Sequence, residues 1–130
     1  MLVKTFGSAV YGIEAITITI EVNISGGSKP YYTIVGLPDK AVSESMERIE
    51  AALQTNGVRM PRQKIVVNMA PADIRKEGSA YDLTIATAIL ASSGQIAGEN
   101  LDKYLIMGEL SLDDTVQNLK CALPIAIQPR

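Results

Sequence analysis

The chain has no histidine or tryptophan, and its 130 residues include one cysteine, Cys121. The absence of histidine excludes histidine triads and histidine-based metal sites. A single cysteine excludes an internal disulfide and any Cys-x-x-Cys motif, which agrees with a reducing compartment. No apolar run approaches the roughly 20 residues that cross a bilayer, and no secretory signal opens the chain. We therefore expect a cytoplasmic protein without a membrane partner.

Two further absences limit the function. The glycines do not form the phosphate-cradling pattern GxxxxGK followed by Ser or Thr, so these residues should bind no ATP and need no cofactor. The formal net charge is −2, so the chain lacks the basic field of an autonomous nucleic-acid binder. Any binding of nucleic acid must therefore be local.

Alternating hydrophobicity marks one strand clearly. Five apolar residues alternate with polar ones and should share a buried face, namely Ile16, Ile18, Ile20, Val22 and Ile24. We expect a sheet rich in antiparallel pairs formed by residues 2–10, 15–25, 31–35, 64–68 and 104–112. Short turns between the first three of these segments predict an antiparallel meander, with Gly26 and Gly27 at a hairpin tip.

Helical spacing follows the third strand. Val42, Met46, Ile49 and Leu53 predict a helix over residues 38–55, and Glu44 and Arg48 should form an exposed pair on its other side. Residues 83–91 are apolar almost all round and predict a core helix. A third helix is expected beyond Leu119. One domain over residues 1–130 accommodates all of these elements.

The run from Asn68 to Leu83, NMAPADIRKEGSAYDL, is the most unusual segment. It joins a buried strand to a buried helix through a polar loop, and loops placed in this way often carry function. Arg75 and Lys76 lie in this loop, where we expect exposed side chains that contact phosphates. Arg62 and Lys64 are further candidates, and with Arg59 all of these cations could form one basic patch; the alternative is an ordinary solvated surface.

The chain resembles a known family over residues 3–124. The resemblance rests on NMAPADIRKEG followed by YDLTIATAIL, on YTIVGLPDKAVSESMERIEAAL upstream and on MGELSLDD downstream. These motifs are similar to the amino-terminal domain of the magnesium-chelatase-like AAA+ ATPases. The resemblance implies an α+β fold of the ribosomal protein S5 domain 2-like class, which the proteolytic domain of Lon also uses, with helices packed on one face of the sheet.

The resemblance also implies a function. In that family the domain precedes an ATPase module, and the full protein is associated with ATP-driven remodelling of branched DNA during natural transformation. We therefore expect a non-catalytic accessory domain whose partners are the AAA+ module of the same polypeptide, DNA, and further copies in a ring. ATP and Mg2+ are expected for the full-length protein only.

Three alternatives remain open. A Lon-type Ser-Lys peptidase would use Ser79 and Lys120, but the resemblance places the family's nucleophile at Ala80 and its lysine at Leu123, so both groups are displaced. Ser79 is more simply a cap of the following helix. An RNA-binding module would use the same fold class. Finally, a hard cation such as magnesium would suit four carboxylates, those of Asp73, Glu77, Asp82 and Glu109.

Overall fold

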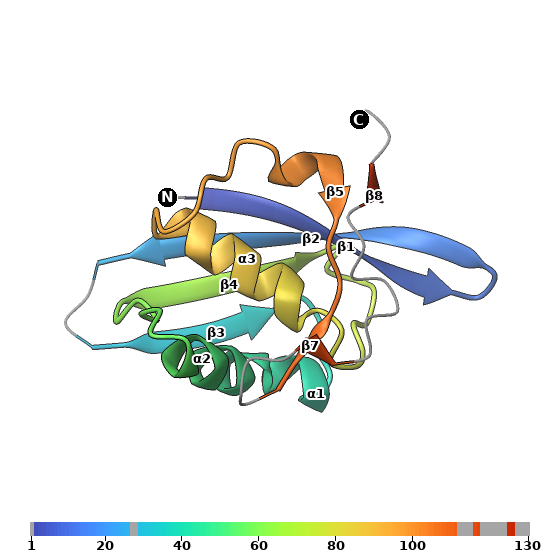
Figure 1. Ribbon diagram of the computed structural model, residues 1–130. Helices are drawn as coiled ribbons and strands as arrows, with labels where there is room; N and C mark the ends of the chain where they lie inside the picture. Colours follow the sequence, from blue (N-terminus) through green and yellow to red (C-terminus); the bar gives the residue numbers. More distant parts are fainter. Residues whose placement is uncertain (1, 27–28, 112–115, 118–124, 127–130) are drawn as a thin grey trace.

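The computed structural model describes residues 2–26, 29–111, 116–117 and 125–126 (Figure 1). Its centre is a four-stranded sheet with the order β1-β2-β4-β3. The strands are β1 (Leu2–Tyr11), β2 (Glu14–Ser25), β3 (Tyr31–Val35) and β4 (Lys64–Ala70). All four lie where the sequence predicted them, and the molecule is a small α+β structure with a mixed sheet.

The strand order differs from the expected meander. β1 and β2 form the antiparallel hairpin, but β4 occupies the place beside β2, and β3 pairs with β4 in parallel. The reason lies in the composition of β4, where Ile65, Val67 and Met69 are fully buried. A strand this apolar is most stable between two neighbours, whereas the half-buried residues of β3 tolerate the edge. β2 and β3 are therefore not neighbours, and Gly26 does not lie at the tip of a hairpin between them. Gly27 lies outside the described residues.

The helices are α1 (Lys40–Ser43), α2 (Ser45–Thr55) and α3 (Asp82–Ser92), and α2 and α3 pack on one face of the sheet (Figure 1). The single helix expected over residues 38–55 is wrong in two respects. The helix begins at Lys40, because the carboxylate of Asp39 accepts a hydrogen bond from Val42 N at 2.8 Å. It is also interrupted at Glu44, which ends α1 and precedes α2.

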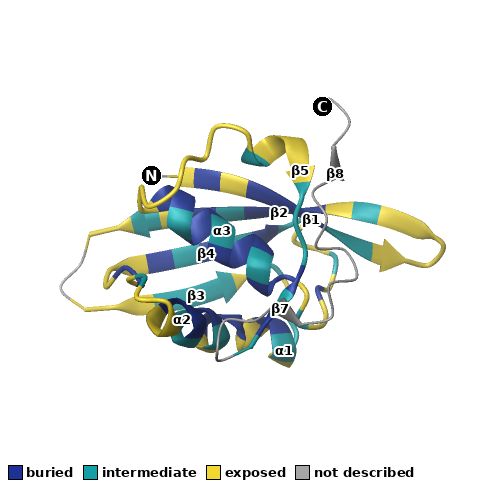
Figure 2. Cartoon of the chain, viewed as in Figure 1, coloured by how far each residue is buried: buried dark blue, intermediate teal, exposed yellow. Residues whose placement is uncertain are grey.

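The core lies between the sheet and the two helices (Figure 2). Ile18, Ile20 and Val22 of β2 are fully buried, while Ile16 and Ile24 near its ends are half-buried. The alternating residues of β2 point to the opposite face, so the predicted register is confirmed. The tip of the β1–β2 hairpin projects from the rest of the molecule (Figure 1). Its apolar residues are exposed, and Ile13 is fully exposed.

The segment after α3 does not join the central sheet as expected. It contains η1 (Leu101–Lys103), β5 (Tyr104–Leu105) and β6 (Glu109–Leu110); β5 pairs with β8 (Ile125–Ala126) and β6 with β7 (Val116–Gln117). Its backbone touches β1 where Ile106 N donates to Phe6 O at 2.8 Å. It is also bonded to the start of α3, with Gly108 N donating to Ala80 O at 2.7 Å and Leu83 N donating to Gly108 O at 3.0 Å. The prediction of a helix beyond Leu119 is wrong at Ile125–Ala126, which form β8. The other residues of the predicted helix lie outside the described ranges. Within the described part of the chain, no helix is long and apolar enough to span a membrane.

A buried ion pair joins the two main helices. Asp82, at the start of α3, is fully buried, and its carboxylate accepts hydrogen bonds from Arg48 Nε at 2.6 Å and Arg48 Nη2 at 2.9 Å. Ser45 Oγ donates to it at 2.7 Å and Leu110 N at 3.2 Å. The hydrogen bond from Arg48 to Asp82 raises the pKa of Arg48, whereas burial acts in the opposite direction. Arg48 was expected to pair with Glu44 on a solvated face; that prediction is wrong, because Arg48 turns inward toward Asp82.

Replacing Asp82 by alanine should lower the free energy of unfolding by about 3–5 kcal/mol, because the guanidinium of Arg48 would lose its buried partner. The control is Lys4→Ala, which removes the exposed Lys4–Glu21 pair and should cost less than about 1 kcal/mol. Urea denaturation of both variants measures the difference. Losses of equal size would contradict the structural role assigned to Asp82.

Candidate nucleic-acid interface

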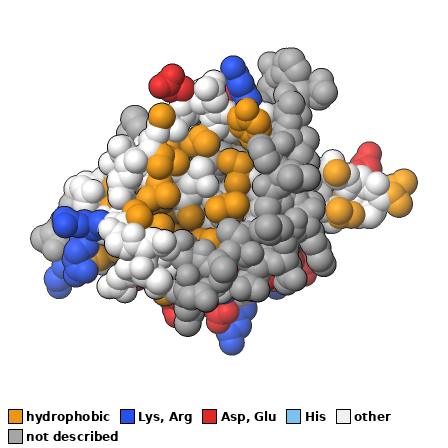
Figure 3. Space-filling view, viewed as in Figure 1, with side chains coloured by type: hydrophobic (Ala, Val, Ile, Leu, Met, Phe, Trp, Pro, Cys, Tyr) orange, Lys and Arg blue, Asp and Glu red, His pale blue; other side chains and the backbone are white. Residues whose placement is uncertain are grey.

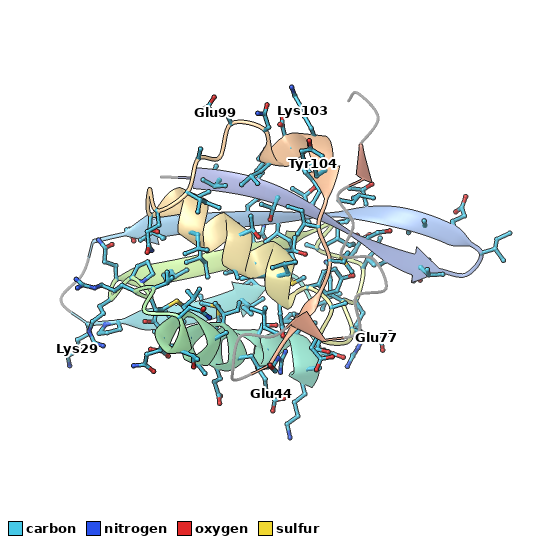
Figure 4. The ribbon with its side chains drawn as sticks, viewed as in Figure 1. Lys29, Glu44, Glu77, Glu99, Lys103 and Tyr104 are labelled. Carbon is cyan, nitrogen blue, oxygen red and sulfur yellow. The ribbon has the colours of Figure 1, made fainter. Side chains whose placement is uncertain are left out.

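The four predicted site residues lie at opposite ends of β4 and do not form one patch. Arg62 and Lys64 stand at its beginning, whereas Arg75 and Lys76 follow its end. A strand of 7 residues is about 20 Å long, so the two groups are separated by the length of the sheet. Figure 4 shows this separation through Lys29, which lies at the first end, and Glu77, which lies at the second. The single patch expected from the sequence is therefore wrong.

At the second end, two loops are hydrogen-bonded together. Residues 36–39 follow β3, residues 71–78 follow β4, and we call the pair the loop clasp. Lys76 N donates to Leu37 O at 3.0 Å, and Asp39 N donates to Lys76 O at 2.9 Å. The carboxylate of Asp39 completes the clasp by accepting a bond from Gly78 N at 3.0 Å while it caps α1. Because these bonds engage the backbone of both loops, the clasp fixes the geometry of the segment before α3.

Lys76 is the centre of the clasp and is fully buried. Its Nζ donates to Gly36 O at 2.7 Å and to Pro71 O. Burial lowers the pKa of the Lys76 amine, and the charge of Asp73 acts in the opposite direction. The expectation that this side chain projects toward phosphate is wrong in placement, because the amine satisfies two carbonyls inside the protein. Arg75 next to it is exposed, as expected, but it shares the loop with the exposed acids Asp73 and Glu77.

The loop of residues 36–39 requires a glycine at its first position. Gly36 has φ +109°, and a Cβ at this position would stand 2.1 Å from Met69 O. Leu37 beside it also has a positive φ, 59°, which is rare for a residue other than glycine. Leu37 is half exposed. The GLPD part of the upstream motif and the KEG part of the loop motif are thus explained by their contacts with each other.

The peptidase and metal alternatives gain no support from the described residues. Ser79 is half-buried and does not cap α3, which begins after Tyr81 without a side-chain capping bond; the capping prediction is wrong. Lys120 and Cys121 lie outside the described ranges, so the Ser-Lys pair stays untested. Asp82 is bonded to Arg48, and no group of three or more acidic or sulfur ligands in the described part of the chain could hold a metal ion. Burial, together with Asp39, raises the pKa of Tyr81 to about 12, so this hydroxyl stays protonated at neutral pH.

At the first end, cations gather where β3 and β4 begin (Figure 3). The group, which we call the basic end, consists of the exposed side chains of Lys29, Arg59, Arg62 and Lys64. It holds four of the 12 lysine and arginine residues of a chain whose net charge is −2. Arg59 and Arg62 line a pocket of about 220 Å³ with Glu50. Burial and the charge of Glu50 raise the pKa of Tyr32 nearby, while Arg62 opposes the shift.

One residue of the basic end, Tyr31, was not predicted from the sequence. Tyr31 is 56% exposed and stands opposite Lys64 in the parallel pairing of β3 with β4. Tyr31 N also donates to Gln63 O at 3.4 Å, which ties it to the segment between Arg62 and Lys64. The signal in the sequence was the run Lys29-Pro30-Tyr31, which places an aromatic residue two positions after a cation at the start of a strand. An exposed aromatic ring among cations is a usual feature of nucleic-acid-binding surfaces.

Comparison with known proteins adds the family context. Residues 20–130 match the family described as subunit ChlI of Mg-chelatase. The chain is 43% identical over 120 residues to protein YifB of Salmonella typhimurium, covering 92% of this chain and 24% of that protein. It is 39% identical over 123 residues to competence protein ComM of Haemophilus influenzae, covering 95% of this chain and 24% of the relative. The chain therefore spans about a quarter of the length of these relatives.

Replacing Lys76 by alanine should lower the free energy of unfolding by about 2 kcal/mol, because the carbonyls of Gly36 and Pro71 lose their donor and the buried stem of Lys76 leaves a gap. The matched variant is Arg75→Ala, the adjacent exposed cation, which should change stability by no more than about 0.5 kcal/mol. Thermal and urea denaturation of the two variants give the comparison. If both variants were as stable as the parent chain, the clasp would not depend on Lys76.

Two glycine variants separate backbone strain from close contact. Gly36→Ala places a methyl group against Met69 O in addition to its positive φ, and should lower the free energy of unfolding by several kcal/mol. Gly57→Ala has a positive φ with nothing within 4 Å of the added Cβ, and should cost only about 1 kcal/mol. Urea denaturation measures both costs, and equal costs would show that the approach of Gly36 to Met69 is unimportant.

Proposed function

The chain belongs to the family of subunit ChlI of Mg-chelatase, and from this membership we propose that it is the amino-terminal accessory domain of a longer AAA+ ATPase. The observation that carries the proposal is the match over residues 20–130 together with relatives about four times as long, of which the chain covers 24%. In this proposal residues 1–130 form one domain, and ATP and Mg2+ bind in a separate module of the same polypeptide.

We propose the S5 domain 2-like class as the finer description of the fold. Its support is the order of the elements: three strands, a helical segment, a fourth strand and a helix, with α2 and α3 on one face of the sheet. The Lon proteolytic domain would share this architecture. A shared fold does not imply a shared activity, since function depends on the groups in the site.

The full-length protein would remodel branched DNA in the cytoplasm as an ATP-driven ring. The name of one relative, competence protein ComM, supports a role in natural transformation. Within this chain, the support for a DNA-guiding role is the basic end, where exposed cations are concentrated on a chain of net negative charge. Arg62 and Lys64 would contact phosphates there, and Arg75 would do so at the opposite end. Lys76 is assigned to the clasp, because its amine already has two acceptors.

The isolated chain should bind DNA weakly, because a few phosphate contacts release few counterions. A ring that presents the basic end several times would raise the effective affinity by roughly 10² or more. The paired substitution Arg62→Ala and Lys64→Ala in the full-length protein should therefore reduce the stimulation of ATP hydrolysis by a synthetic four-way DNA junction several-fold. ATP hydrolysis without DNA should be unchanged, because the two side chains lie in this domain and not in the ATPase module.

Lys103→Ala is the matched control, since Lys103 is an exposed cation in a different part of the molecule (Figure 4). It should leave the stimulation by DNA unchanged. A full-length protein whose ATP hydrolysis does not respond to junction DNA would reject the proposed function. A response that is equal in the parent, the paired variant and the control would reject only the contacts assigned to the basic end.

A further inference from the structure

We propose that the basic end binds single-stranded nucleic acid, with Tyr31 as a stacking platform for an unpaired base and Lys29 and Lys64 as contacts to the backbone. The inference rests on the proposed function and adds to it the class of ligand and the residue that selects it. Four cations alone would suit any polyanion. The exposed tyrosine among them favours a single strand over a duplex, because the faces of paired bases are covered by their neighbours in the stack.

The backbone of Tyr31 is held by strand pairing. It opens β3, whose residues pair with β4 over the whole strand, beginning with Tyr31 opposite Lys64. The next residue, Tyr32, packs against the core and donates from its hydroxyl to Pro61 O at 3.1 Å. Since successive side chains of a strand point to opposite faces, Tyr31 projects from the face that the helices leave uncovered. A base that stacks on this ring would therefore pay little for ordering the protein.

Two cations stand near Tyr31 through the topology of the sheet. Lys64 pairs with Tyr31 on one side and with Ser25 on the other, so it stands in the row that crosses β2, β4 and β3. Lys29 precedes Tyr31 by two residues and lies at the same end of the sheet (Figure 4). Arg62 lines the pocket with Glu50 of α2 instead, so it lies on the helix side of the basic end. Phosphates on either side of a stacked base would thus meet cations at the beginnings of two neighbouring strands.

Exposure alone does not qualify a tyrosine for this role, as a second exposed tyrosine shows. Tyr11 is 65% exposed at the projecting tip of the β1–β2 hairpin. Its neighbours in the sequence are Val10, Gly12, Ile13 and Glu14, which offer no positive charge to a phosphate. Tyr11 therefore has the ring without the cations, and it provides a matched control for Tyr31.

The test is an NMR titration of the chain at low ionic strength with an oligothymidylate of about 12 nucleotides, a length within the usual range of single-strand sites. Resonances of Tyr31, Lys29 and Lys64 should shift, whereas those of Tyr11 should not. Tyr31→Ala should weaken binding roughly tenfold, because one stacked base is lost. Tyr31→Phe should stay within about twofold of the parent, since the ring remains. Tyr11→Ala should have no effect, and Lys64→Ala should lower the salt slope by about 0.7.

A duplex of the same length is the second arm, and Tyr31→Ala should leave its weaker binding unchanged. The proposal is overturned if the oligothymidylate shifts no resonance at the basic end, or if Tyr31→Ala binds it as tightly as Tyr11→Ala does. It is also overturned if Tyr31→Ala weakens the binding of duplex and single strand equally. The proposed function fails separately, when junction DNA does not stimulate ATP hydrolysis by the full-length protein.

Discussion

The carboxylate of Asp82 is the interaction on which the arrangement of the helices depends. It is fully buried and takes hydrogen bonds from Ser45 and Arg48 of α2 and from Leu110 N of β6, so one side chain joins three segments that are distant in the sequence. An ionised carboxylate is stable in such a place only when its oxygens are fully bonded. The positions of α2, α3 and the end of β6 are therefore coupled through this one carboxylate.

Much of the fold follows from local patterns, and much of its topology does not. The alternation in β2 and the apolar run in β4 located both strands, because side-chain period is a local property. Nothing local indicated that β4 would separate β2 from β3, since that order depends on which strand buries more apolar surface between two neighbours. Arg48 was misplaced for a similar reason: its partner Asp82 is 34 residues away, and helical spacing suggested Glu44 instead.

The candidate site, like the fold, could be predicted from the sequence only where local patterns determine it. Arg62 and Lys64 are exposed as expected, but their proximity to Arg75 along the sequence was misleading, because a whole strand lies between them. Lys76 is charged and lies in a polar loop, so no local pattern predicts that its amine donates to two carbonyls within the protein. The GLPD and KEG parts of the family motifs meet in the clasp, whereas the basic end lies outside the most conspicuous motif.

The insertion of β4 between β2 and β3 also bears on how the chain acquires its structure during synthesis. The β1–β2 hairpin is closed by contacts that are near in sequence, and it can form early. β3 has no partner until β4 arrives, since its only pairing in the sheet is with that strand. The emerging polypeptide therefore has to keep an unpaired apolar edge on β2 until Ala70 has left the ribosome. During this interval the nascent chain presents an unpaired strand edge, a feature that favours aggregation.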